Sequence, residues 1–285
     1  MICRTLSLLI LAAATLPAQA PLTARAVIER IQKQTGVAWR AETVDTFKAG
    51  DPGTVVTGVA TTMMATYDVL QRAAAQGKNL VITHEPIFYS HLDQTAALSA
   101  GGDKVWAEKE KFIREHKMVV WRFHDHWHMM KPDGIMVGVT RKLGWQSYQD
   151  QTTKGLFTLP KTTVKQLALE IQDKLGPKAL RVVGPADLSV QRVALMPGAG
   201  GPAGHMKALR RDDVDVAVIG EVPEWETIEY VADAAAQGKK KALILIGHIE
   251  SEQPGMEYCA EWLKGFVKEV PVSFVAAKDP FWQVR

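Results

Sequence analysis

Short apolar runs alternate along the chain with longer segments in which apolar residues recur every three or four positions. The first pattern is typical of strands buried on both faces, and the second of helices that pack one face against a sheet. The clearest strands are Leu80–Ile82 and Ala242–Ile246, and the clearest helix is Val164–Leu175, which ends at Gly176 and Pro177. The alternation predicts an α/β protein whose sheets are covered by helices.

The same two patterns predict the other elements. A helix with one apolar face should follow Thr23, whose side chain can cap its first turn. Further helices are expected at Tyr67–Gln76, Lys104–Lys117, Ile135–Leu143, Trp225–Gln237 and Met256–Val267, and further strands at Val55–Ala60, Met118–Phe123, Leu156–Leu159, Leu180–Val183, Val190–Met196, Val214–Ile219 and Val272–Val275.

A six-residue repeat links two of the strands to histidines. The sequence Ala-Ala-Ala-Gln-Gly-Lys occurs at 73–78 and again at 234–239, each time between a predicted helix and an apolar strand. The first strand leads into His84 and Glu85, and the second leads into His248. Ligands of open α/β sheets collect just beyond such strand ends, so we expect the two ends to converge.

Other candidate ligands lie nearby in the sequence. His124-Asp-His-Trp-His128 places three imidazoles at alternate positions, and on extended backbone all three would project from one face. Glu252 lies four residues after His248, on the same side of any helical turn that begins there. A set of nitrogen and oxygen ligands suits zinc, iron, manganese or nickel and argues against a thiolate site.

Composition sets the size of the fold and gives no sign of a nucleic-acid partner. A chain of 285 residues with 47% hydrophobic content can form one large domain or two lobes. The net charge of +3 is small, and the longest basic run is the triplet 239–241, so charge gives no argument for a nucleic-acid partner.

The order of these motifs resembles the NGG-interacting factor three family, also known as GTP cyclohydrolase I type 2 homologues. The resemblance is strongest at Leu70–Phe88 and Val214–Gly255. It implies two α/β lobes with mixed sheets flanked by helices, a metal site in the cleft between them, and a homohexamer. The first lobe would comprise residues 21–128 and 236–285, and the second residues 129–235.

The resemblance also implies a set of metal ligands for one or two divalent transition-metal ions per chain. Two positions depart from the family pattern, because Glu85 stands where the family has a histidine and His128 stands where it has an aspartate. The ligands carried over are His84, Glu85, His124, His128, His248 and Glu252.

Metal-assisted hydrolysis of a small molecule, with a nucleotide-like substrate as one option, is the reaction that this ligand set favours. Glu221 or Glu250 would act as general base, and His126 or Asp125 would orient a ligand imidazole.

Two other readings stay open. The segment Gly198-x-Gly200-x-x-Ala203 follows a strand and has Glu221 about 20 residues on, as in a dinucleotide-binding fingerprint. Alternatively, the same metal ligands would serve a non-catalytic metal-binding or scaffold protein. Substrate turnover that a chelator abolishes would separate hydrolysis from this second alternative.

The first twenty residues predict a secretory signal. Arg4 provides the positive charge, Leu6–Leu16 the apolar stretch, and Ala18-Gln-Ala20 the cleavage site. The apolar stretch is shorter than the ~20 residues that a membrane span needs, so no stable anchor should remain after processing. Removal of Cys3 would leave Cys259 without an intramolecular disulfide partner, as a buried structural thiol.

We therefore expect cleavage after Ala20 and export, most simply to the periplasm. Intact-mass analysis of the periplasmic fraction should show a chain that begins at Pro21. An unprocessed chain recovered from the cytoplasm would contradict both expectations.

Overall fold

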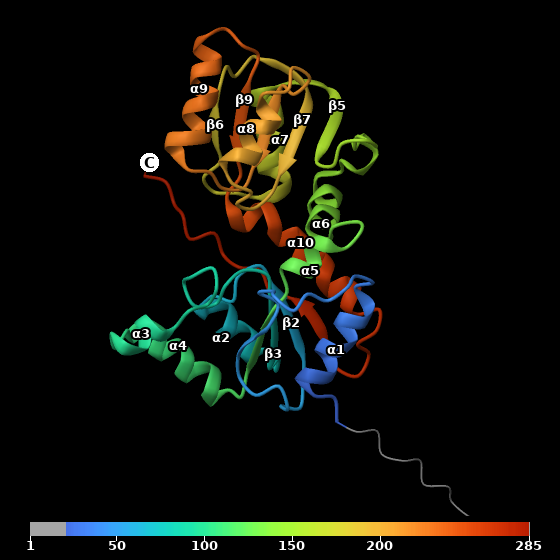
Figure 1. The fold of residues 1–285 in the computed structure, drawn as a ribbon, viewed down its shortest axis with the longest axis vertical. Coiled ribbons are helices and arrows are strands. Elements are labelled where there is room, and N and C mark those ends of the chain that lie inside the picture. The colour runs from blue at the N-terminus through green and yellow to red at the C-terminus, as the bar shows by residue number, and fades with distance from the viewer. Residues whose placement is uncertain (1–20, 285) are drawn as a thin grey trace, which may run out of the picture.

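A computed structural model describes residues 21–284, so the predicted signal segment lies outside the described residues. Two five-stranded mixed sheets, each flanked by helices, form two lobes that follow each other along the longest axis (Figure 1). The predicted α/β class with two lobes is confirmed. Within the described range, no helix has the length and apolar character needed to cross a membrane.

The first sheet is parallel except at one edge. Its strands lie in the order β1 (Phe47–Ala49), β4 (Val119–Arg122), β3 (Leu80–Thr83), β2 (Val59–Thr62) and β10 (Val272–Phe274). Only β1 runs antiparallel to its neighbour, so β2, β3 and β4 end at the same edge of the sheet. The helices of this lobe are α1 (Ala24–Gln34), α2 (Tyr67–Ala75), α3 (Ala96–Ala100) and α4 (Lys104–Glu115).

The second sheet has a parallel centre and two antiparallel edges. Its order is β5 (Leu156–Thr163), β7 (Ser189–Met196), β8 (Val216–Ile219), β9 (Ala242–Leu245) and β6 (Arg181–Val183). Its helical segments are η1 (Gln146–Tyr148), α7 (Val164–Leu175), α8 (Pro202–Leu209), η2 (Glu224–Ile228) and α9 (Glu229–Ala236).

The boundary between the lobes differs from the predicted one. Strand β9 was assigned with residues 236–285 to the first lobe, but it pairs in parallel with β8 in the second sheet. The physical reason is that the strand after the second hexapeptide repeat completes its own βαβ unit rather than returning to the first sheet. The repeats still end their helices as expected, with Gly77 and Gly238 at φ of +69° and +73°.

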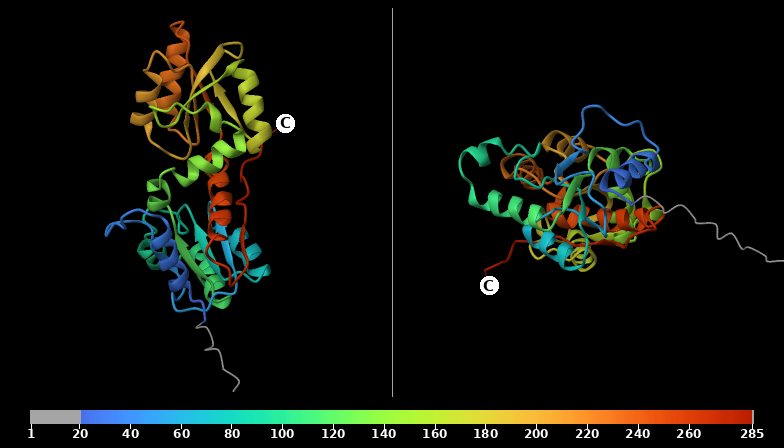
Figure 2. Two further views of the ribbon diagram at one scale, coloured as in Figure 1. Left: turned by 90° about the vertical axis from the view of Figure 1, so that its right-hand side faces the viewer. Right: turned by 90° about the horizontal axis from the view of Figure 1, so that it is seen from below.

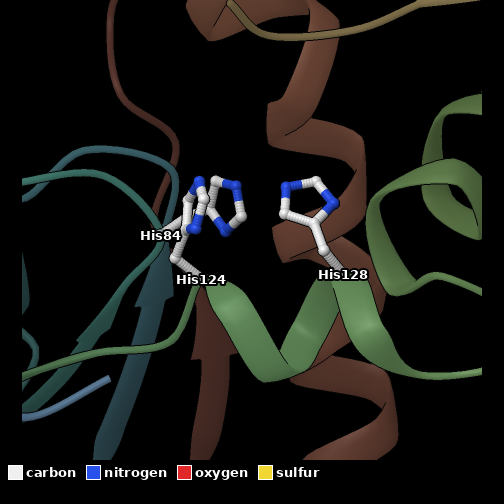
Figure 3. A group of neighbouring side chains, drawn as sticks. All are labelled: His84, His124 and His128. Atoms are coloured by element: carbon white, nitrogen blue, oxygen red, sulfur yellow. The ribbon is translucent and has the colours of Figure 1, made fainter. Parts of the chain in front are cut away.

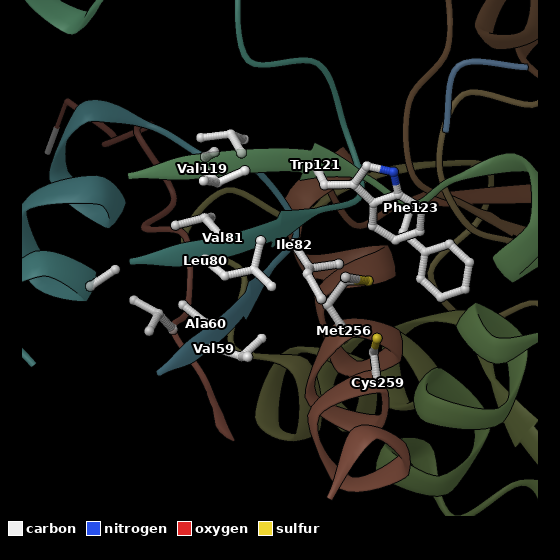
Figure 4. Close-up of a cluster of buried hydrophobic side chains, with 14 of the residues drawn as sticks. Val59, Ala60, Leu80, Val81, Ile82, Val119, Trp121, Phe123, Met256 and Cys259 are labelled. Atoms are coloured by element: carbon white, nitrogen blue, oxygen red, sulfur yellow. The ribbon is translucent and has the colours of Figure 1, made fainter. Parts of the chain in front are cut away.

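Helix α10 (His248–Leu263) joins the two lobes. It begins directly after β9, eight residues earlier than the helix predicted at 256–267, and its buried side chains enter the core of the first lobe. Met256 and Cys259 lie against the strand residues of the first sheet, including Ile82 (Figure 4).

Helices α6 (Gly134–Leu143) and α10 cross between the lobes at very short distance (Figure 2). A Cβ on Gly138 would lie 2.2 Å from the carbonyl oxygen of Pro254, and one on Gly255 would lie 2.6 Å from the Cα of Ile135. The two backbones can approach this closely only because each side provides a glycine at the crossing.

Gly138→Ala should therefore destabilise the protein by about 1–3 kcal/mol, because the new methyl group would overlap backbone that cannot rotate away. Chemical denaturation of both proteins would measure the difference. Gly204→Ala in α8 is the matched control, since its methyl group would have its nearest neighbour at 3.8 Å, and helix propensity should make it neutral or stabilising. Equal stability of the Gly138 variant and the parent would contradict the close crossing.

Candidate metal centre

Six polar side chains converge where the first sheet, α5 (Asp125–Met129) and the start of α10 meet. They are the six residues that the sequence singled out as ligands: His84 and Glu85 after β3, His124 after β4, His128 on α5, and His248 and Glu252 on the first turns of α10. Strand ends and a helix beginning thus bring together residues that are up to 168 positions apart, from 84 to 252.

Residues 125–129 form α5 with His124 as its N-cap, so the extended backbone considered for 124–128 does not occur. On a helix His124 and His128 lie one turn apart on the same side, and their rings face the same space as the His84 ring (Figure 3). His126 points the other way, where its Nδ1 lies 2.7 Å from Asp45 and its ring stacks on Trp39. His126 is therefore a core residue and does not orient a ligand imidazole.

The carboxylate of Glu252 is the centre of one half of the cluster. Its side chain is buried, and its oxygens lie 3.5 Å from Nε2 of His84, 3.9 Å from Nε2 of His128 and 3.1 Å from Nε2 of His248. One carboxylate therefore faces three imidazole nitrogens.

Glu85 holds the other half together. Its Oε1 lies 3.7 Å from Nε2 of His124 and 3.4 Å from Nε2 of His248, while Oε2 accepts a hydrogen bond of 3.1 Å from Arg122. Arg122 is fully buried and also donates to the carbonyl of His84. Arg122 was not among the residues predicted for the site, although a charged residue at the end of an apolar strand is a usable signal.

The imidazoles of His84, His124, His128 and His248 share one arrangement. In each, Nδ1 lies within hydrogen-bond distance of an oxygen outside the cluster, and Nε2 faces the cluster. Partners that fix the far nitrogen set the orientation of a ligating histidine and raise its basicity. The Nδ1 partners are the carbonyl of Phe123 for His84 at 3.1 Å, Asp125 for His124 at 2.9 Å, Asp133 for His128 at 3.2 Å and Glu221 for His248 at 2.9 Å.

Only part of this outer layer of Nδ1 partners could be predicted from the sequence. Asp125 holds the orienting position suggested for it, but Asp133 was missed. The Asp133 side chain also caps α6 by accepting from the backbone of Ile135 and Met136, and this capping role was its only sequence signal.

Burial and neighbouring charges set distinct protonation states. Burial, reinforced by the adjacent imidazoles, lowers the pKa of His84 well below its usual value. Burial also acts to lower the pKa of His248, but its hydrogen bonds to Glu252 and Glu85 outweigh this and raise the pKa to about 10. His84 is therefore neutral and His248 is an imidazolium between two carboxylates.

The donor set fits a metal ion. Nδ1 of His84 donates to a carbonyl, so its buried Nε2 carries the lone pair, and that nitrogen has no hydrogen-bond partner. An unpartnered acceptor at a fully buried position is costly unless it binds something. Candidate ligand atoms of His84, His124 and His128 lie within 4.8 Å of one another, as do those of His84, Glu85 and Glu252.

The two predicted general bases lie in different places. Glu221 is exposed and contacts the cluster through His248. Glu250 is buried on another side of the first turn of α10, beside Gly247, and its carboxylate forms no hydrogen bond or ion pair with the six clustered side chains. Burial raises the pKa of Glu250.

The glycine-rich loop after β7 packs against the start of α10. Ser251 Oγ accepts a hydrogen bond of 3.0 Å from the amide of Gly198, and a Cβ on Gly198 would lie 2.3 Å from a carboxylate oxygen of Glu252. The close approach of Glu252 thus requires glycine at position 198. This contact accounts for the glycine without the bound pyrophosphate that a dinucleotide-binding loop would hold.

Comparisons with known proteins agree with the motif order. The family model Duf34/NIF3 (NGG1p interacting factor 3) matches residues 25–280. A Clostridium perfringens protein named GTP cyclohydrolase 1 type 2 homolog is 23% identical over 246 residues, which cover 81% of this chain and 88% of that protein. A protein of the same name from Clostridium acetobutylicum is 22% identical over 235 residues, 79% of this chain and 82% of that one.

Solved structures share the fold. The Bacillus cereus protein related to NIF3 has a TM-score of 0.72 at 15% identity, covering 93% of this chain and 100% of that chain. A hypothetical protein of Staphylococcus aureus has a TM-score of 0.71 at 17% identity, with the same coverage.

Gly198→Ala should reduce metal binding at least tenfold, because its methyl group would displace the Glu252 carboxylate and its φ of +73° disfavours alanine. Zinc retained after dialysis, measured by elemental analysis, would show the loss. The matched control in the same loop is Gly200→Ala. Its methyl group would lie 3.6 Å from its nearest neighbour, which is an ordinary van der Waals contact. If both variants retain zinc like the parent, the loop does not position Glu252.

Proposed function

The chain belongs to the Duf34/NIF3 family, and on that premise we propose that it is a metal-dependent hydrolase of a small molecule. The observation that carries this proposal is the arrangement of four imidazoles, each held at Nδ1 and each presenting Nε2 to Glu85, to Glu252 or, for His248, to both. Such outer partners are typical of histidines that bind metal.

The six side chains would hold one or two divalent transition-metal ions, with zinc, iron, manganese and nickel all compatible with nitrogen and oxygen donors. A bound divalent ion supplies Lewis acidity and lowers the pKa of a water molecule toward neutrality. His84 offers a neutral Nε2 without prior loss of a proton, whereas His248 must first release its Nε2 proton.

Of the two candidate bases, contact with the cluster favours Glu221. Its carboxylate accepts a hydrogen bond from Nδ1 of His248, so it orients that ring and stabilises positive charge on it. As an exposed carboxylate at the edge of the cluster, Glu221 would also take the proton from an incoming water in this proposal. Glu250 forms no hydrogen bond or ion pair with the six clustered side chains, which makes it the weaker candidate.

The proposed class of substrate is inferred from the names of two related proteins. Two clostridial proteins of this family bear the name GTP cyclohydrolase 1 type 2 homolog, and we therefore propose a nucleotide-like substrate. A non-catalytic metal-binding protein would use the same ligands, and chelator-sensitive turnover would separate the two functions. The homohexamer and the periplasmic location stay predictions from the sequence.

Replacing either central histidine should remove metal without unfolding the protein. We expect His84→Ala and His248→Ala each to reduce zinc retained after dialysis at least tenfold, because each loses an Nε2 that faces Glu252. Elemental analysis, with circular dichroism to confirm folding, is the measurement.

His116→Ala provides the control, because this exposed histidine lies at the end of α4 and bonds only within that helix. Full zinc retention in both cluster variants would show that these histidines are structural.

A further inference from the structure

A cavity of about 560 Å³ opens beside Glu85. It lies between the turn that precedes α2, including Thr66, and the loop Pro86–Asp93 that follows Glu85. Its volume falls in the usual range for small-molecule sites, about 300–1,000 Å³. Because Glu85 lines the cavity and also contacts His124 and His248, a ligand in the cavity would reach the edge of the candidate metal centre.

The loop 86–93 is held in one conformation by buried polar contacts. Asp93 Oδ1 accepts hydrogen bonds from the amides of Ile87 and Phe88, at 2.7 and 2.8 Å. Its other oxygen lies 3.6 Å from the ammonium of Lys48, and the guanidinium of Arg122 donates to the carbonyl of His91, farther along the loop. The cavity wall is therefore preorganised.

Tyr89 lines this cavity in an unfavourable backbone conformation. Its φ is +60°, a region that a bulky residue rarely adopts, and its side chain is 60% exposed. The exposed ring gains little packing energy to offset this strain, and strained residues of this kind collect at ligand sites. The exposed ring offers a flat apolar surface to whatever enters the cavity.

Lys109 presents a buried ammonium to the same space. Its side chain is 4% exposed and lines the cavity, and Nζ donates a hydrogen bond of 2.7 Å to the carbonyl of Ile87. The ammonium also lies 5.3 Å from the centre of the Tyr89 ring and 5.9 Å from that of Phe88. An ammonium has three N–H donors, so donors remain for an acceptor on a ligand. Burial lowers the pKa of Lys109 to about 8, in keeping with a donor held away from bulk water.

We propose that this cavity is the substrate pocket of the candidate metal centre, and that it takes a planar heteroaromatic ring bearing a carbonyl oxygen. The ring stacks on Tyr89, the carbonyl oxygen accepts a hydrogen bond from Lys109, and the rest of the molecule extends toward Glu85. The proposal deepens the hydrolase function proposed above and rests on it for the reaction, but ring binding itself needs no metal.

Guanosine is a suitable probe, because its purine ring carries a carbonyl oxygen. Calorimetric titration of the metal-free protein should show binding that weakens at least tenfold in Tyr89→Gly and in Lys109→Met. Glycine adopts the φ of +60° without strain, which offsets its greater freedom in the unfolded chain, so Tyr89→Gly should keep a melting temperature close to that of the parent while losing affinity. A purely structural role of Tyr89 would not give that combination.

Leu92→Ala is the matched control, since Leu92 is an exposed apolar residue of the same loop that does not line the cavity. This variant should bind guanosine like the parent. Failure of the parent to bind guanosine, or unchanged affinity in Tyr89→Gly, would overturn the proposal.

The His84→Ala variant separates this proposal from the proposed function. It should lose zinc and still bind guanosine, because His84 does not line the cavity. Zinc binding without guanosine binding in the parent would refute the pocket and leave the metal centre standing. Guanosine binding without zinc binding in the parent would refute the metal centre and leave the pocket standing.

Discussion

The contact between the backbones of α6 and α10 is the constraint on which both lobes and the cluster depend. Gly138 and Gly255 allow this approach, and it fixes the rotation of α10 about its own axis. The same rotation directs Met256 and Cys259 into the first core and Glu252 toward the imidazoles. A helix free to rotate by a fraction of a turn would satisfy the core and lose the cluster, because side-chain positions on a helix are rigidly coupled.

The second requirement is the compensation of buried charge. Glu85 and Glu252 lie in a site with little access to water, where an unpaired carboxylate would cost several kcal/mol. Arg122 places a permanent positive charge beside Glu85. Burial acts to raise the pKa of Glu85, but the hydrogen bond to His248 and the neighbouring positive charges outweigh burial and lower the pKa. The imidazolium of His248 lies between both carboxylates. Arg122 and His248 thus offset the charges of the two buried carboxylates.

Most of the elements followed from the sequence because their signals are local. Helix α7, with its Thr163 cap and Gly176 end, lies at its predicted residues, since periodicity and capping depend on neighbouring positions only. The six clustered side chains were also identified, because buried parallel strands deliver their last residues to one edge. The five-residue helix α5 was missed, since a segment so short has no periodicity to read. Asp133 and Arg122 left only weak local signals, a helix cap and a charge at the end of an apolar strand, because their contacts with His128 and Glu85 form only in the folded chain. The positive φ of Tyr89 is likewise set by the folded loop.

The path of the chain through the two lobes has a consequence for the order of folding. Residues between α6 and β9 run through the second sheet without interruption, whereas the first sheet lacks β10 and the α10 side chains of its core until the chain returns. During synthesis, the second lobe can therefore complete its sheet while the first still exposes an unpaired edge at β2. The histidines of the first lobe emerge from the ribosome long before Glu252 does, so the cluster is assembled only at the end of folding.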